Sequence, residues 1–124
     1  GLLEVGDFGY DSGVGAARAL LDRHADLTAI IASSDQMALA VLEVARERGL
    51  AVPGDLSLVS FDNTPIVRFT QPPLTAIDQP IAETVSRAVE HLITRAPEGD
   101  DDAVIEVSAG LVERASTAPP PGRA

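Results

Sequence analysis

The stretch DLSLVSFDN, residues 55–63, decides the fold, because it joins a short apolar run to a carboxylate and an amide at its end. An apolar run of this length is expected to form a strand buried on both faces of a parallel sheet. We place this strand at 57–61. Similar short runs, rich in β-branched residues or leucine, predict further strands at 2–6, 28–32 and 75–78.

Longer segments with helical periodicity follow these strands. Helices are predicted at 12–24, 35–49 and 80–95, and a single helical turn at 64–69. Gly49 can adopt the left-handed conformation that ends a helix, and Pro53-Gly54-Asp55 predicts a turn before the next strand. Short strands that alternate with helices indicate βα units. We therefore expect an α/β fold with a largely parallel sheet flanked by helices.

The C-terminal part of the chain carries weaker signals. Residues 104–107 and 111–113 predict a terminal strand pair, or one strand interrupted at Gly110. The acidic run at 100–102 predicts a solvated loop and not a metal site. We expect one domain at 1–114 and, because of its proline run, a disordered tail at 115–124.

Composition excludes several classes of function. The chain has 124 residues, with 9 Lys and Arg against 19 Asp and Glu, and its net charge of −10 repels nucleic-acid backbones. It has no cysteine, which suits a cytoplasmic protein, and with only two distant histidines no zinc site and no cofactor are expected. No apolar run approaches the roughly 20 residues of a membrane span. The strand-like start at Gly1, without an initiator methionine, indicates a fragment of a longer protein.

Polar and aromatic side chains stand just after each predicted strand. The carboxyl ends of parallel strands line the ligand crevice of an open sheet, so we expect these side chains to lie close together. An aromatic face, a carboxylate and small hydroxyl or amide groups match what a sugar presents. The strand ends therefore predict a carbohydrate site. The four junctions are Asp7-Phe8, Ser33-Ser34-Asp35, Asp62-Asn63 and Asp78-Gln79.

Each candidate also has a structural interpretation. Asp35 or Ser34 can cap the helix that follows, and Phe8 can be an ordinary core residue. Asp62 can belong to a structural turn, although it follows a buried strand and precedes no strong helix that needs a cap. Gln79 can equally be an exposed loop residue.

An enzymatic function is not expected. His24 and His91 lie on predicted helices away from the crevice, and nothing there orients a nucleophile. The segment Gly13-Val14-Gly15 resembles part of a phosphate-binding glycine loop, but the third glycine is absent. Close helix packing is the preferred explanation for these glycines.

The predicted helix at 35–49 carries two apolar stripes, and one sheet cannot cover both. Leu39 and Leu42 form the second stripe, so either a neighbouring helix or a second subunit must bury them. The first stripe contains Met37, Val41, Val44 and Ala45.

Three longer motifs stand along the chain: ASSDQMALA at 32–40, GLAVPGDLSLVSFDN at 49–63 and PPLTAIDQP at 72–80. In this order and spacing they resemble the effector-binding domain of LacI-type (lactose-repressor-like) transcriptional regulators. The closing LVERAST at 111–117 is similar to the C-terminal signature of the same family. The resemblance covers nearly the whole chain.

The resemblance implies a periplasmic-binding-protein-like fold of type I with two lobes, of which this chain holds mainly the C-terminal one. It implies a homodimer in which a sugar or related metabolite binds between the lobes and controls operator DNA binding through an upstream helix-turn-helix segment. By position, Phe8 matches the sugar-stacking aromatic of the family, Ser34 its usual Asn, Asp62 its ligand carboxylate and Gln79 a pocket amide.

Further positions are implied less directly. Asp7, Asp35 and Asn63 are candidates for either ligand contacts or caps. The positions that match the family's dimer seam are Leu39, Leu42, Phe69 and Gln71.

The chain departs from the family pattern at the candidate site. Ser60 stands where Gly is usual, Asn63 where a second Asp is common, and Ser34 is a shorter donor than Asn. The first βα unit of the lobe is expected upstream, and we expect the resulting gap in the sheet to be filled by a swapped or symmetry-related strand. A periplasmic sugar-binding protein of a transport system and an enzyme of the doubly wound class are the alternatives to a regulator.

Overall fold

The computed structural model describes residues 1–94 and 104–122. The acidic run and the predicted end of the last helix lie outside these residues. The helices are α1 Tyr10–Arg23, α2 Asp35–Glu47 and α3 Ile81–Thr94, with a 3-10 helix, η1, at Pro65–Arg68. The strands are β1 Ala29–Ile31, β2 Ser57–Asp62, β3 Thr75–Asp78 and β4 Gly110–Val112.

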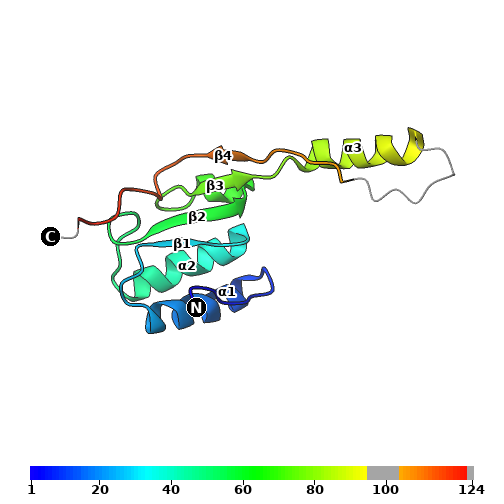
Figure 1. Cartoon of the computed structure of the whole chain (residues 1–124). Coiled ribbons are helices and arrows are strands. Elements are labelled where there is room, and N and C mark those ends of the chain that lie inside the picture. Colours follow the sequence, from blue (N-terminus) through cyan, green and yellow to red (C-terminus); the bar gives the residue numbers. More distant parts are fainter. Residues whose placement is uncertain (95–103, 123–124) are drawn as a thin grey trace.

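The strands form one sheet in the order β1-β2-β3-β4 (Figure 1). β1, β2 and β3 are parallel, and β4 is antiparallel to β3. The predictions of an α/β fold and a largely parallel sheet are therefore confirmed. Gly110 begins β4 and does not interrupt a strand, and residues 104–107 are not part of the sheet.

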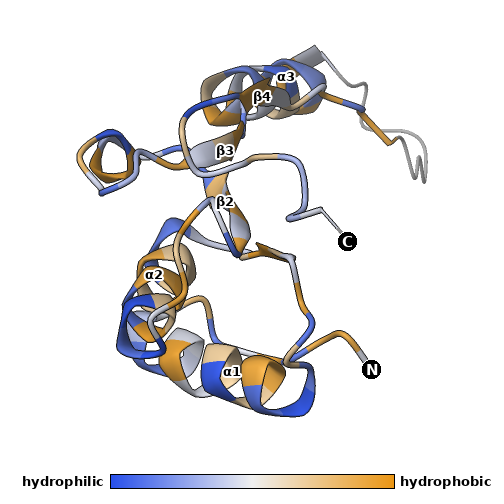
Figure 2. Ribbon diagram, turned by 90° about the vertical axis from the view of Figure 1, so that its left-hand side faces the viewer, coloured by the Kyte–Doolittle hydropathy of each residue, from blue (hydrophilic) through white to orange (hydrophobic). Residues whose placement is uncertain are grey.

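One face of the sheet is covered by helices. α1 packs against α2, and α2 packs against β2, so both helices lie on the same side (Figures 1 and 2). Leu58 and Ser60, two residues apart on β2, are both fully buried, whereas Ile31 on the edge strand is 69% exposed. The aliphatic core between helices and sheet contains Ala17, Leu21, Ile30, Val41, Val44, Leu56, Leu58 and Leu74.

Capping interactions define both ends of α2. The Ser34 side chain is the N-cap and accepts a hydrogen bond from the Met37 backbone N–H at 3.1 Å. At the other end Gly49 has φ +70, and the Leu50 N–H donates to the Ala45 carbonyl at 2.9 Å. This geometry confirms the left-handed glycine predicted after the helix.

The strand predicted at 2–6 is wrong. A strand needs a hydrogen-bonded neighbour, but this segment lies against α1 instead, where Glu4 forms an ion pair with Arg23. Its apolar residues Leu2, Leu3 and Val5 are exposed to solvent, Val5 to 87%. A cavity of about 80 Å³ is lined by Leu2 of this segment and Ile30 of β1.

The disordered tail predicted from Ala115 is wrong for residues 115–118. The Ser116 side chain is fully buried, and its Oγ accepts a hydrogen bond from the Thr75 N–H at 2.8 Å. The Leu58 N–H donates to the Ser116 carbonyl at 2.8 Å. The proline run at 119–121 predicts disorder, but Ser116, which precedes it, links β2 to β3 through hydrogen bonds.

Helix α3 extends away from the body formed by the sheet, α1 and α2 (Figure 1). None of its residues is buried, although one side of it carries Ile81, Val85 and Val89. In the described part of the chain, no helix combines the length and apolarity that a membrane crossing requires.

Gly13 and Gly15 should respond in opposite ways to substitution by alanine. A Cβ at Gly13 would lie 2.9 Å from the Met37 Cα and 2.9 Å from the Ala40 Cβ, so α1 and α2 would have to separate. We expect Gly13→Ala to lower the free energy of unfolding by about 1–3 kcal/mol. A Cβ at Gly15 meets nothing within 4 Å, so Gly15→Ala should raise it by about 0.5–1 kcal/mol through helix propensity.

Urea unfolding followed by circular dichroism measures both changes. Equal effects of the two substitutions would contradict close packing as the reason for Gly13.

Candidate functional site

An open cleft of about 500 Å³ lies at the carboxyl ends of the parallel strands. Its lining includes all four residues predicted as ligand contacts, from four different strand ends or turns. Ser33, which belongs to one of the four predicted junctions, also lines it, as does Phe61, for which no site role was predicted. The lining residues are Phe8, Ser33, Ser34, Phe61, Asp62 and Gln79.

Phe8 presents its ring to solvent at this cleft. The side chain is 64% exposed, which contradicts a core role, and the residue has φ +66. Ser34 Oγ donates a hydrogen bond to the Phe8 carbonyl at 2.7 Å. A positive φ costs a non-glycine residue about 1–3 kcal/mol, so surrounding contacts must hold this backbone in place.

Asp62 ends β2 in a strained turn. Asp62 has φ +107 and Asn63 has φ +61, two consecutive non-glycine residues in the left-handed region. Gln79 Nε2 donates to Asp62 Oδ1 at 2.5 Å, so the amide orients the carboxylate. Within residues 1–94 and 104–122, no hydrogen bond from the protein reaches Asp62 Oδ2. This oxygen is available to accept a hydrogen bond from a ligand.

Ser34 has a double structural role. Its hydroxyl donates to the Phe8 carbonyl and accepts from the Met37 N–H, so its proton is already committed within the protein. One lone pair of Oγ is not used by these two hydrogen bonds. The predicted alternative, that Ser34 caps the helix, is therefore confirmed, and Ser34 also lines the cleft.

The Asn63 side chain forms hydrogen bonds within the protein. Its Nδ2 donates to Asp78 Oδ1 at 3.0 Å, and its Oδ1 accepts from Arg114 Nη2 at 2.7 Å. Asn63 does not line the cleft. The amide instead ties the turn after β2 to the end of β3 and to the segment after β4.

Asp7 is also outside the cleft lining. Its Oδ1 accepts hydrogen bonds from the Gly9 N–H at 2.9 Å and from Ser12 Oγ at 2.5 Å. The hydrogen bond from Ser12, followed by that from Gly9, lowers the pKa of the Asp7 carboxyl. These bonds fix the turn that leads into α1, directly beside Phe8.

Asp35 does not cap α2, because Ser34 does. Asp35 is the first residue of the helix and is only 3% exposed. Its carboxylate accepts hydrogen bonds from Ser60 Oγ and, at 2.6 Å, from the Thr64 N–H. Both partners are more than twenty residues away in sequence, so a local motif could not have identified them.

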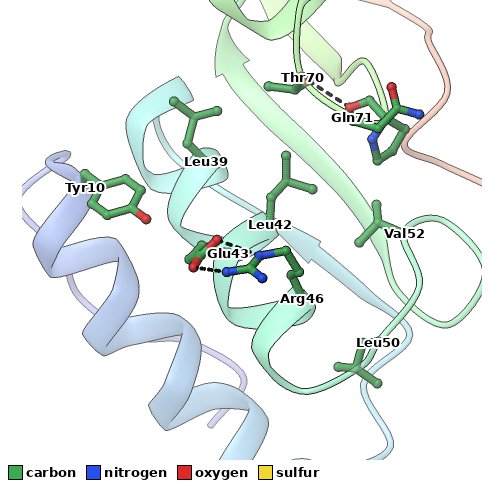
Figure 3. Close-up of a pocket in the computed structure, with 10 residues that line it drawn as sticks. Tyr10, Leu39, Leu42, Glu43, Arg46, Leu50, Val52, Thr70 and Gln71 are labelled. Carbon is green, nitrogen blue, oxygen red and sulfur yellow. Dashed lines mark hydrogen bonds and ion pairs between the residues drawn. The ribbon is translucent and has the colours of Figure 1, made fainter.

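A second groove, of about 490 Å³, lies on the outer side of α2 (Figure 3). Leu39, Leu42 and Gln71, three of the residues predicted at a subunit interface, line it. Phe69, the fourth, is 84% exposed and lies outside the lining. Arg46 Nη2 lies 2.6 Å from Glu43 Oε1 in this groove and forms an ion pair with it. The hydrogen bond from Arg46 lowers the pKa of the Glu43 carboxyl.

Neither histidine lines the cleft. His24 is the C-cap of α1, and His91 lies on α3. Among the residues that the structure describes, no three His, Cys, Asp or Glu side chains are placed to hold a metal ion.

Comparison with known proteins gives consistent matches along the chain. Residues 5–117 match the family described as "Periplasmic binding protein-like domain". The HTH-type transcriptional regulator CelR of Thermobifida fusca is 49% identical over 65 residues, which are 52% of this chain and 19% of CelR. Catabolite control protein A of Priestia megaterium is 49% identical over 59 residues, 48% of this chain and 18% of that protein.

Solved structures match over most of the chain. The structure described as "transcriptional regulator CelR-cellobiose complex" is 38% identical, has a TM-score of 0.76, and is matched over 90% of this chain and 34% of its own. A LacI family transcriptional regulator from Bifidobacterium animalis subsp. lactis is 36% identical with a TM-score of 0.82, over 93% of this chain and 42% of that chain.

The match thus spans about a fifth of the length of these curated relatives and about a third to two fifths of these solved chains. The family match covers nearly all of the residues described above, including the cleft. The chain therefore belongs to the periplasmic binding protein-like domain family.

Proposed function

We propose that this chain is the sensing part of a transcriptional regulator that binds a sugar or related metabolite and thereby controls operator binding. The observation that carries the proposal is the combination in one cleft of the exposed Phe8 ring and the Asp62 carboxylate. A sugar offers an apolar ring face to the aromatic and hydroxyl donors to the carboxylate. Gln79 adds an amide that both orients Asp62 and lines the cleft.

The cleft provides only one side of the proposed binding site. It is open to solvent, and the chain spans about a third of the length of the solved chain described as a CelR-cellobiose complex. We propose that a second lobe of the complete protein closes over the sugar. A sugar that contacts both lobes favours the closed arrangement, and the change in closure alters how a dimer presents its DNA-binding segments.

The relatives favour a regulator over a transport protein. CelR, MalR and CytR are all named as HTH-type transcriptional regulators or repressors. The net charge of −10 makes this chain a poor match for a phosphate backbone. We therefore expect operator contacts to come from another part of the complete protein. We accordingly expect the protein to act in the cytoplasm.

Sugar binding is tested by a thermal-shift screen of the full-length polypeptide, with cellobiose among the sugars. A sugar at about 100 times its Kd should raise the Tm by about 5 °C. Asp62→Asn, which removes the carboxylate charge but keeps an acceptor for Gln79, should weaken binding of that sugar by about tenfold or more.

Asp55→Asn is the matched control for this substitution. Asp55 accepts a hydrogen bond from the Ala51 N–H at 2.8 Å in an exposed turn outside the cleft lining. This variant should bind the sugar like the unaltered protein. If no sugar stabilises the unaltered protein, or if Asp62→Asn binds as well as the control, the proposed function is wrong.

We further propose that the groove on α2 is the homodimer interface. Leu39 and Leu42 are half-buried in this groove and face Gln71 across it (Figure 3). Phe69 is exposed two residues before Gln71 in the chain. A second copy that covers this surface would bury the apolar stripe that the sheet leaves open.

Leu39→Asp should convert the dimer to a monomer. Burial of an unpaired carboxylate is strongly unfavourable, and we expect dimerisation to weaken by about 100-fold or more. Light scattering coupled to size-exclusion chromatography gives the mass. Gln36→Asp adds the same charge at an exposed position of α2 outside the groove and should leave the mass unchanged. A Leu39→Asp protein that remains dimeric would overturn this interface.

A further inference from the structure

We propose that Asp35 is a positioning residue for the ligand carboxylate Asp62. Asp35 is not among the residues that line the cleft, although its neighbours Ser33 and Ser34 are. Instead its buried carboxylate holds the turn on which Asp62 stands. The inference deepens the proposed function and rests on it, because it takes Asp62 as a sugar contact.

The two oxygens of Asp35 connect both ends of this turn to α2. Oδ1 accepts from the Ser60 hydroxyl, which comes two residues before Asp62. Oδ2 accepts from the Thr64 backbone N–H at 2.6 Å, two residues after Asp62. The carboxylate therefore bridges residues 60 and 64 and encloses the segment that contains the strained pair.

The turn needs such restraint. Asp62 at φ +107 and Asn63 at φ +61 both occupy conformations that non-glycine residues adopt only when their surroundings force them. Arg114 and Asp78 hold the Asn63 side chain. Asp35 supplies further contacts from α2, so hydrogen bonds from several elements restrain the turn.

The burial of Asp35 is consistent with this role. A buried carboxylate is tolerated when hydrogen bonds satisfy both of its oxygens, and here they do. Its place in the first turn of α2 adds the favourable interaction of a negative charge with the helix N-terminus. Ser60, fully buried, supplies a donor that the glycine of the family pattern cannot.

Two substitutions of Asp35 separate positioning from mere bulk. Asp35→Ala removes both acceptors. Asp35→Asn can keep both contacts, because its Oδ1 can accept from the Thr64 N–H while its Nδ2 donates to Ser60 Oγ after the hydroxyl rotates. The expected result is release of the turn in Asp35→Ala and its retention in Asp35→Asn.

The first measurement is hydrogen exchange of the Thr64 amide in the full-length polypeptide without ligand. We expect exchange to accelerate about tenfold or more in Asp35→Ala and to stay within about threefold in Asp35→Asn. Asp55→Ala, which removes an acceptor from the exposed turn at Ala51, should leave Thr64 unchanged. Ser60→Ala removes one of the two contacts and should give an intermediate rate, which keeps the test usable if Asp35→Ala does not fold.

The second measurement is binding of cellobiose, used as the probe, or of the most stabilising sugar from the thermal-shift screen if cellobiose does not bind. We expect Kd to rise about tenfold or more in Asp35→Ala and to be nearly unchanged in Asp35→Asn and Asp55→Ala. Unchanged Thr64 exchange in a folded Asp35→Ala protein overturns the inference, as does faster exchange with unaltered sugar affinity. If the unaltered protein binds no sugar, the proposed function fails instead, and Thr64 exchange alone decides whether Asp35 restrains the turn.

Discussion

The parallel pairing of β2 with β3 is the constraint on which the site depends. Their register places Val59 beside Thr75 and Asp62 beside Asp78, so both strands end at the same level. Gln79 then follows directly and reaches Asp62 Oδ1. A shift by one residue would turn every side chain of β2 to the opposite face, moving Ser60 away from Asp35 and Asp62 away from Gln79.

Buried polar groups transmit this register to neighbouring elements. Ser116 joins β2 to β3 through the Leu58 carbonyl and the Thr75 N–H, and Asp35 joins α2 to the turn after β2. Among the described residues, no buried side-chain nitrogen or oxygen lacks a hydrogen-bond partner. Satisfied buried groups of this kind favour one arrangement over its alternatives, because any shift would leave a donor or acceptor unpaired in the core. The cleft is therefore built on a well-determined edge of the sheet.

Local patterns predicted most of the secondary structure but not the long-range contacts. The apolar run of β2 and the helix that ends before Gly49 are strong local signals, and the structure contains both. Residues 2–6 have the composition of a strand, but pairing depends on a neighbour that no local pattern reveals. The order of residues 115–118 likewise depends on Ser116 meeting strands some forty to sixty residues away.

Sequence patterns likewise predicted part of the candidate site but not its long-range contacts. The rule that ligands bind at the carboxyl ends of parallel strands predicted four junctions, and the family resemblance singled out one residue in each. These four residues line one cleft, although the strand predicted before Phe8 is absent: Phe8, Ser34, Asp62 and Gln79. The rule could not predict that Asp35 is turned into the core or that Asn63 is held by Arg114, because both depend on tertiary partners. The sugar-binding role of the four predicted residues in the cleft is best tested by a crystal structure of the full-length polypeptide with a bound sugar. We expect a sugar ring stacked on Phe8 with a hydroxyl donating to Asp62 Oδ2, whereas a sugar bound elsewhere, with neither residue in contact, would show that this cleft is not the binding site.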